Sequence, residues 1–160
     1  MASTNSFLKF TDIAVFSRNY PKYLEAASGK APDERVTFRS GVRWVRAAQA
    51  ISRFGPRRIY FAPNGAGSHI EYEADLVTIQ LDPSDDDSTT RKLLKDVLPC
   101  IRHEELWNGS VRTPYVIMNC RQVATPFPQT RLHKESDGSP LAENFSRSYA
   151  LVRELRADDA

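Results

Sequence analysis

Arginine and aromatic side chains gather around residues 39–64, and further aromatic residues follow later in the chain. Cations bind phosphates, and an aromatic ring stacks on an unstacked nucleobase, which contributes on the order of 1–3 kcal/mol per base. The combination is typical of a site for a single base of a nucleic acid. Each ring has the alternative role of packing in the core. The candidate rings are Trp44, Tyr60, Phe61, Trp107 and Tyr115.

Positive charge is concentrated in the first third of the chain. Residues 1–58 hold 11 Lys/Arg against 4 Asp/Glu, whereas residues 59–110 hold 4 against 10. Such an excess attracts phosphates by counterion release, although a solvated protein face has the same composition. We expect the phosphate contacts to come from Arg39, Arg43, Arg57 and Arg58.

Other chemistries have weaker sequence support. Cys100 and His103 are spaced as a zinc pair, but Cys120 and His133 are 13 positions apart, so we expect no metal site. The chain has no Gly-x-Ser-x-Gly nucleophile motif, and we predict no catalytic residues. The glycine-rich stretch 64–68 precedes a predicted strand instead of the helix that a phosphate-binding loop needs, which indicates a hairpin turn.

Length and composition fit one domain. The 160 residues are 41% apolar and 26% charged, which is ordinary for a globular chain. We predict a flexible tail over 1–11, a domain over 12–153 and a polar tail over 154–160. With two cysteines and no secretion signal, the chain is expected in the cytoplasm. No apolar run approaches the roughly 20 residues of a membrane span, so no membrane partner is expected.

Sequence periodicity predicts the elements that would position these groups. A helical repeat from Val42 to Arg53 places Trp44 on an apolar arc and the arginines nearly opposite. Alternation and short apolar runs predict the strands. Together they imply a mixed α/β domain of five or six strands. Strands are predicted at 13–16, 36–38, 58–62, 70–81, 113–123 and 149–152, with shorter helices at 21–25 and 93–98.

The stretch Gly41-Val42-Arg43-Trp44, followed by Gly55, Ile59-Tyr60-Phe61 and the alternating residues 70–76, resembles the EVE domain family. That family belongs to the PUA-like superfamily, alongside the YTH and ASCH domains. Its members commonly open a helix with Gly-Val-Arg-Asn and end a later strand near Asp-Pro, as Asp82-Pro83 does here. The specific match covers about 40 residues. The resemblance implies an α+β fold: a PUA-like, partly closed β-barrel of five to six strands flanked by helices, with a pocket suited to a modified nucleobase.

The chain also departs from the EVE pattern. Arg39 stands where the family often has tryptophan, Trp44 where it has asparagine, and Pro56 where its turn has aspartate. At the end of the first strand EVE domains usually place a lysine and an acid, and this chain has Ser17-Arg18-Asn19. Trp44 therefore has two interpretations. The family pattern places it at a pocket, and its apolar arc places it in the core.

We predict a nucleic-acid-binding module, without a cofactor, that takes one modified (for example methylated) base of DNA or RNA into an aromatic pocket near Trp44. One alternative is a small hydrolase or nucleotide-processing enzyme on an ASCH-like barrel, which would bring a lysine, a threonine and a glutamate together at the pocket. Another is an interaction domain without a pocket ligand. The predicted nucleic-acid-binding residues are Ser17, Arg18, Asn19, Arg39, Gly41, Val42, Arg43, Trp44, Arg57, Arg58, Phe61, Asn64 and Trp107.

Overall fold

The computed structural model of the protein describes residues 12–65, 67–82, 88–101, 113–147 and 149–155. The predicted N-terminal tail, Trp107 and the last five residues of the predicted C-terminal tail lie outside these residues. Glu154 and Leu155, predicted as the start of that tail, contact the domain. The backbone N–H of Glu154 donates to the Asp12 carbonyl, and that of Leu155 donates to the Tyr60 hydroxyl at 2.9 Å.

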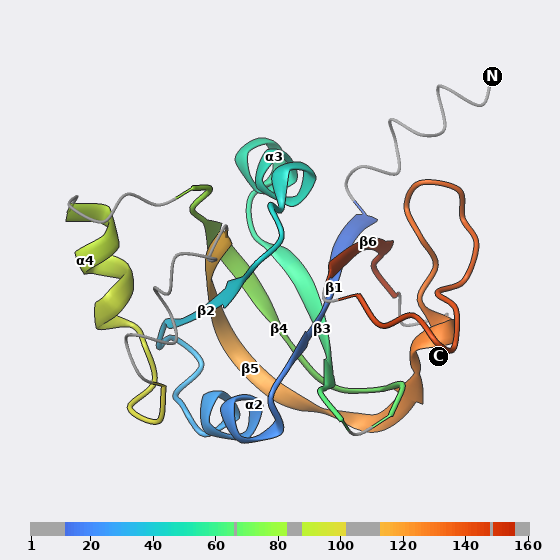
Figure 1. Ribbon diagram of the computed structural model, residues 1–160, viewed down its shortest axis with the longest axis horizontal. Helices are drawn as coiled ribbons and strands as arrows, with labels where there is room; N and C mark the ends of the chain where they lie inside the picture. Colours follow the sequence, from blue (N-terminus) through green and yellow to red (C-terminus); the bar gives the residue numbers. More distant parts are fainter. Residues whose placement is uncertain (1–11, 66, 83–87, 102–112, 148, 156–160) are drawn as a thin grey trace.

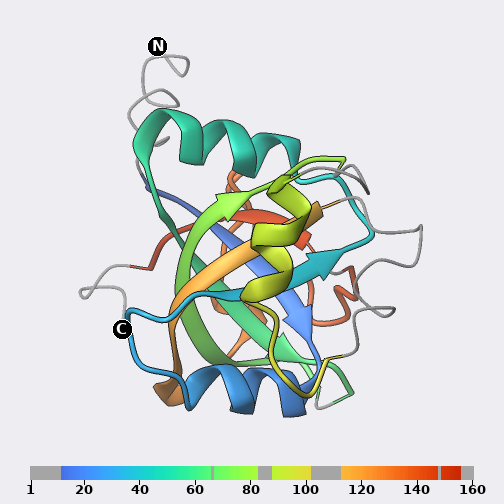
Figure 2. The same cartoon turned by 90° about the vertical axis from the view of Figure 1, so that its left-hand side faces the viewer.

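Six strands form one sheet, and helices lie at its two ends and beside one edge (Figure 1). Helix α3 and helix α2 lie at opposite ends in both views (Figures 1 and 2), and α4 lies beside β2. The strands are β1 (Ile13–Asn19), β2 (Val36–Ser40), β3 (Arg57–Pro63), β4 (His69–Ile79), β5 (Thr113–Pro128) and β6 (Tyr149–Arg153). The helices are α2 (Pro21–Ser28), α3 (Val45–Phe54), α4 (Ser88–Lys95) and a 3₁₀ turn, η2 (Gln129–Arg131).

The strand order is β2-β5-β4-β3-β1-β6. Strands β1 and β3 are parallel, with Val15 opposite Ile59 and Asn19 opposite Pro63, and the other neighbours are antiparallel. A parallel pair brings both carboxyl ends to the same edge of a sheet. The ends of β1 and β3 are therefore adjacent.

The sheet is open, so the prediction of a partly closed barrel was wrong on closure, whereas the six strands and flanking helices agree with it. Among the described residues, the edge strands β2 and β6 do not pair with each other. The sheet curves instead. Its longest pairing, β4 with β5, has register shifts at Ile70/Tyr72, Glu73/Asp75 and Leu76/Thr78. Such bulges bend a strand and increase its twist, and β5 is visibly curved (Figure 1).

Helix α3 begins three residues later than predicted because a buried hydroxyl holds the preceding loop. The Thr113 side chain, at the start of β5, is fully buried. Its Oγ1 donates to the Val42 carbonyl at 2.7 Å and accepts from the Trp44 backbone N–H at 3.1 Å. Residues 41–44 are therefore held as a loop, and the helix starts at Val45.

Strand β1 is buried on both faces. Val15 packs in one apolar cluster with Trp44, while Ala14 and Phe16 pack in a second cluster with Leu141. Successive side chains of a strand point to opposite faces. The odd-numbered residues of β1 therefore face the helices, and the even-numbered residues face the segment that follows β5.

Trp44 lies in the core. Its side chain is 0% exposed, and its indole stacks on Tyr115 at 4.2 Å between ring centroids and on Tyr149 at 4.9 Å. The ring planes are 24° and 13° from parallel. Stacked aromatic pairs contribute beyond the burial of their area. This three-ring stack joins the start of α3 to β5 and β6.

We expect Trp44→Ala to lower the free energy of unfolding by about 3–5 kcal/mol, because it removes the central ring of the stack and leaves a cavity. Urea unfolding would measure the loss. Val42→Ala, two residues away at a side chain that is 48% exposed, should change it by less than about 0.5 kcal/mol. Equal effects of the two substitutions would contradict the core placement of Trp44.

Two buried tyrosines, Tyr60 and Tyr115, and the partly buried Tyr149 make the fold sensitive to alkali. Burial raises the pKa of Tyr60 to about 12 and that of Tyr149 to about 12, and it also raises the pKa of Tyr115. An unfolded tyrosine titrates near pH 10. Between about pH 10 and 12 the unfolded chain therefore loses protons that the folded chain keeps, and stability falls.

We expect the free energy of unfolding to decline as the pH rises above about 10. Denaturant unfolding at several alkaline pH values would measure the decline, and ultraviolet absorbance would follow tyrosine ionisation in the native protein. Ionisation of all six tyrosines near pH 10 in a chain that stays folded would contradict it.

Candidate functional site

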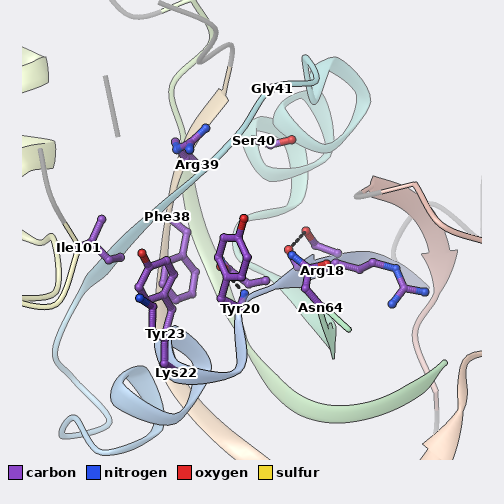
Figure 3. A pocket seen from close by; sticks show the side chains of 12 residues that line it. Arg18, Tyr20, Lys22, Tyr23, Phe38, Arg39, Ser40, Gly41, Asn64 and Ile101 are labelled. Carbon is purple, nitrogen blue, oxygen red and sulfur yellow. Dashed lines mark hydrogen bonds between the residues drawn. The ribbon is translucent and has the colours of Figure 1, made fainter. Parts of the chain in front are cut away.

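A pocket of about 510 Å³ lies at the adjoining carboxyl ends of β1 and β3, between α2 and the end of β2 (Figure 3). This volume is within the range of about 300–1,000 Å³ that is usual for ligand sites. Six of the predicted site residues line it, and six further residues complete it. The lining residues are Ser17, Arg18, Asn19, Tyr20, Lys22, Tyr23, Phe38, Arg39, Ser40, Gly41, Asn64 and Ile101.

Successive side chains of β1 point to opposite faces of the sheet, so only some of its predicted site residues direct their side chains into the pocket. Ser17 and Asn19 share the face of Val15, and both side chains hydrogen-bond the hydroxyl of Tyr115. The Asn19 amide oxygen also accepts from the backbone N–H of Tyr20 at 2.8 Å. The floor of the pocket is therefore a polar cluster with fixed orientations, anchored on the three-ring stack.

Arg18 contributes backbone to the pocket and sends its guanidinium to the other face, as Figure 3 shows. Nη2 donates to Gln129 Oε1 at 2.7 Å and to the Phe145 carbonyl at 2.8 Å, and Nη1 donates to the Gly67 carbonyl at 3.3 Å. Burial lowers the pKa of this guanidinium. Because these bonds hold its two terminal nitrogens, Arg18 positions the end of β1, and its head group is directed away from the pocket.

Aromatic rings form one side of the pocket. Tyr20 is 55% exposed and meets Tyr23 edge-on at 5.5 Å between ring centroids. Phe38 lies deeper, at 1% exposure. The Lys22 ammonium lies over the Tyr23 ring, 5.0 Å from its centroid. These rings lie together in Figure 3, on the opposite side from the Arg18 guanidinium.

A cation and a polar loop close the other side. Arg39 is partly exposed at the rim, where it forms no ion pair with another residue in the described part of the chain. The buried Ser40 hydroxyl accepts from the Val42 backbone N–H at 3.2 Å, which shapes the turn through Gly41. Asn64 is exposed, and its backbone N–H donates to the Asn19 carbonyl at 2.8 Å. The two asparagines are thus held together across β1 and β3.

Three predicted arginines lie away from the pocket. Arg57 and Arg58 begin β3, and the pocket lies beyond the end of that strand, about 20 Å away at 3.3 Å per residue. Arg58 pairs with Glu73 at 3.0 Å, and Arg57 donates to the carbonyl oxygens of the preceding turn. Arg43 pairs with Asp82 at 2.8 Å.

The predicted aromatic walls are also elsewhere. Trp44 and Phe61 are 0% exposed and belong to the same apolar cluster, so neither offers a ring face to a ligand in this structure. Val42 is exposed on the loop next to Gly41 and does not line the pocket. Trp107 lies outside the described residues.

Sequence reasoning missed the aromatic side of the pocket. Tyr20 was assigned no role from the sequence, and Phe38 was placed only within the strand predicted at 36–38. The signal was present: a tyrosine beside a strand-ending proline is left at the strand's end, where sites form in open sheets. Alternation in β2 likewise separates Phe38 and Ser40 from Arg39. The missed lining residues are Tyr20, Lys22, Tyr23, Phe38, Ser40 and Ile101.

Other chemistries have little support at this pocket. Its described lining includes one lysine, Lys22, and neither the threonine nor the glutamate that a hydrolase of the ASCH-like kind would bring there. Among the described residues, no three His, Cys, Asp or Glu side chains lie close enough to hold a metal. Burial raises the pKa of the Cys120 thiol to about 12, so near neutral pH this cysteine is a thiol and not the thiolate that a nucleophile requires. None of the described helices is long and apolar enough to cross a bilayer.

No protein-family model matches this sequence, and no curated protein matches it, so the EVE resemblance stays a prediction. Among solved structures, the chain is similar to the YTH domain of the Zygosaccharomyces rouxii MRB1 protein, which was solved in complex with N6-methyladenosine RNA. The two are 12% identical, with a TM-score of 0.42, and the match covers 92% of this chain and 79% of that one. Because the likeness is this distant, we base the functional proposal on the site itself.

We expect Arg18→Met to lower the free energy of unfolding by about 1.5–3 kcal/mol, because it removes the charged donor of three hydrogen bonds. Arg35→Met is the matched control, since the Arg35 guanidinium makes one exposed hydrogen bond to the described residues, to Thr78 at 3.2 Å. Urea unfolding of both variants would measure the difference. Equal losses would show that the Arg18 bonds do not fix the end of β1.

Proposed function

We propose that this protein is a nucleic-acid-binding module that takes one base of a single strand, RNA or DNA, into the pocket at the ends of β1 and β3. The observation that carries the proposal is the composition of this pocket. An exposed aromatic ring, a guanidinium without an ion-pair partner among the described residues and two side-chain amides surround a space of about 510 Å³. Each of these groups has a counterpart in a nucleotide.

Tyr20 would supply the stacking face. Its ring is more than half exposed and is braced edge-on by Tyr23. A base that leaves its stack loses contacts, and a fixed aromatic ring restores them for any base. The amides of Asn19 and Asn64 each offer donor and acceptor groups to the hydrogen-bonding edge of the base. Asn19 is the more selective of the two, because Tyr20 and Tyr115 fix its orientation.

A methylated base fits the deep end of the pocket. Phe38, Tyr23 and Ile101 are each at most 8% exposed and form an apolar wall there. Burying one methyl group against such a wall is worth about 0.8 kcal/mol, which corresponds to about fourfold in affinity. We therefore propose that the site prefers a modified base over its unmodified form by about this factor.

Arg39 would bind a phosphate of the same strand. It stands at the rim, next to the base site, and has no acidic partner among the described residues. A cation held beside an aromatic pocket adds affinity by releasing counterions from the phosphates. This gain falls as the salt concentration rises, because releasing an ion into a more concentrated solution is less favourable. Arg39 thus accounts for attraction to the backbone, and the pocket accounts for choice of the base.

We expect Tyr20→Ala to weaken binding of a short single-stranded oligonucleotide by about 5- to 150-fold, since one stacking contact is lost. Fluorescence anisotropy would measure affinity for heptanucleotides with a central N6-methyladenosine, 5-methylcytosine or unmodified base, in RNA and in DNA. Phe54→Ala is the matched control, because this ring is 38% exposed and lies outside the pocket.

Arg39→Gln should weaken all the oligonucleotides to a similar extent and reduce the salt slope of log K by about 0.7, the value for one phosphate contact on a single strand. Arg35→Gln serves as its control. Mass spectrometry of the recovered oligonucleotides should show no chemical change. Wild-type protein that binds none of them at low salt, or that converts one of them, would overturn the proposed function.

A further inference from the structure

A second groove, of about 360 Å³, opens where the start of α3 faces β6 and the segment before it. Four cations contribute to its lining: Arg43, Arg46, Lys134 and Arg147. They come from segments far apart in the sequence, and the fold brings them to one hollow. The aromatic ring of Tyr149 forms part of the same lining.

Two of these cations have acidic partners. Arg43 pairs with Asp82 at 2.8 Å, and Arg46 pairs at 2.9 Å with Glu135, which also lines the groove. Both arginine side chains remain about half exposed, at 53% and 51%. The Arg43–Asp82 pair is exposed at both ends and is therefore weak. The Arg46–Glu135 pair is less exposed, because the Glu135 side chain is only 11% exposed.

Lys134 and Arg147 are different. Neither forms an ion pair with another residue that the structure describes, although Lys134 is near enough to Asp137 to help lower the pKa of that carboxyl. They leave a net positive charge in a groove whose apolar wall includes Phe145 and Tyr149. Cations beside aromatic rings are the arrangement that single-stranded nucleic-acid sites use for backbone and bases.

The second groove is a near neighbour of the base pocket. The pocket reaches Gly41 and the groove begins at Arg43, so the two residues are at most about 7 Å apart along the chain. The three-ring stack links them as well. Tyr149 lines the groove, and Tyr115, on the same stack, is hydrogen-bonded to Ser17 and Asn19 of the pocket.

We infer that the second groove is the site for the phosphodiester backbone flanking the bound base, with Lys134 and Arg147 each contacting a phosphate. This inference rests on the proposed function and makes its ligand a strand of several nucleotides. A strand leaving the pocket would pass Arg39 and the exposed loop at Gly41 before it reaches the groove. A free nucleoside would occupy the pocket alone.

The test is the double substitution Lys134→Gln/Arg147→Gln, measured with the heptanucleotides above over a series of salt concentrations. We expect the salt slope of log K to fall in magnitude by about 1.4, which corresponds to two phosphate contacts on a single strand. Methylated and unmodified oligonucleotides should weaken by the same factor. Binding of the free nucleosides, followed by NMR, should be unchanged.

The matched control is Lys30→Gln/Arg35→Gln, which removes the same charge from the segment between α2 and β2. It should leave the slope within about 0.3 of the wild-type value, because those side chains lie outside both sites. An unchanged slope in the Lys134/Arg147 variant, or an equal change in the control, would overturn the inference while leaving base binding intact. A wild-type protein that binds neither nucleosides nor oligonucleotides would overturn the proposed function itself.

Discussion

Burial on both faces of β1 restricts which side chains each position of this strand can hold. Its odd-numbered side chains must suit the cluster beneath the helices, and its even-numbered side chains must suit the cluster beneath residues 132–145. Where the strand ends, the same alternation sends Ser17 and Asn19 to the pocket and Arg18 to the opposite face. A one-residue shift in register would exchange these roles. Strand β1 thus supplies both the polar residues of the pocket floor, Ser17 and Asn19, and the Arg18 side chain that holds the end of the strand.

Parallel pairing with β3 determines which residues lie beside Ser17 and Asn19 at the end of β1. It places the turn after β3 beside the end of β1, and the Asn64 to Asn19 backbone bond fastens the two. On the other side, Thr113 holds the loop from Val42 to Trp44 with two hydrogen bonds from one hydroxyl. The rim of the pocket is therefore supported from β3 and from β5, so most of its geometry exists before a ligand arrives.

Much of the fold could be predicted from the sequence, because periodicity reports local burial. All six predicted strands and the main helix are present, with ends displaced by a few residues. The start of α3 was misplaced because the Thr113 hydroxyl is distant in sequence from the loop it holds. Closure of the sheet was misjudged because it depends on whether β2 and β6 meet, and no local pattern reports that.

The site was predicted only in part, because closeness in sequence does not show which residues are close in space. Residue types near Ser17–Asn19 and Arg39–Gly41 marked the right place, whereas Arg57 and Arg58 looked close in sequence and lie at the far end of β3.

The hydrogen bonds of the Arg18 guanidinium should persist at low pH. All three acceptors of its guanidinium are amide oxygens, two from the backbone and one from Gln129. Amide oxygens carry no titratable proton, so acid cannot break these bonds by neutralising a partner, as it can with a carboxylate. The hydrogen bonds that hold this edge of the pocket are therefore insensitive to acid.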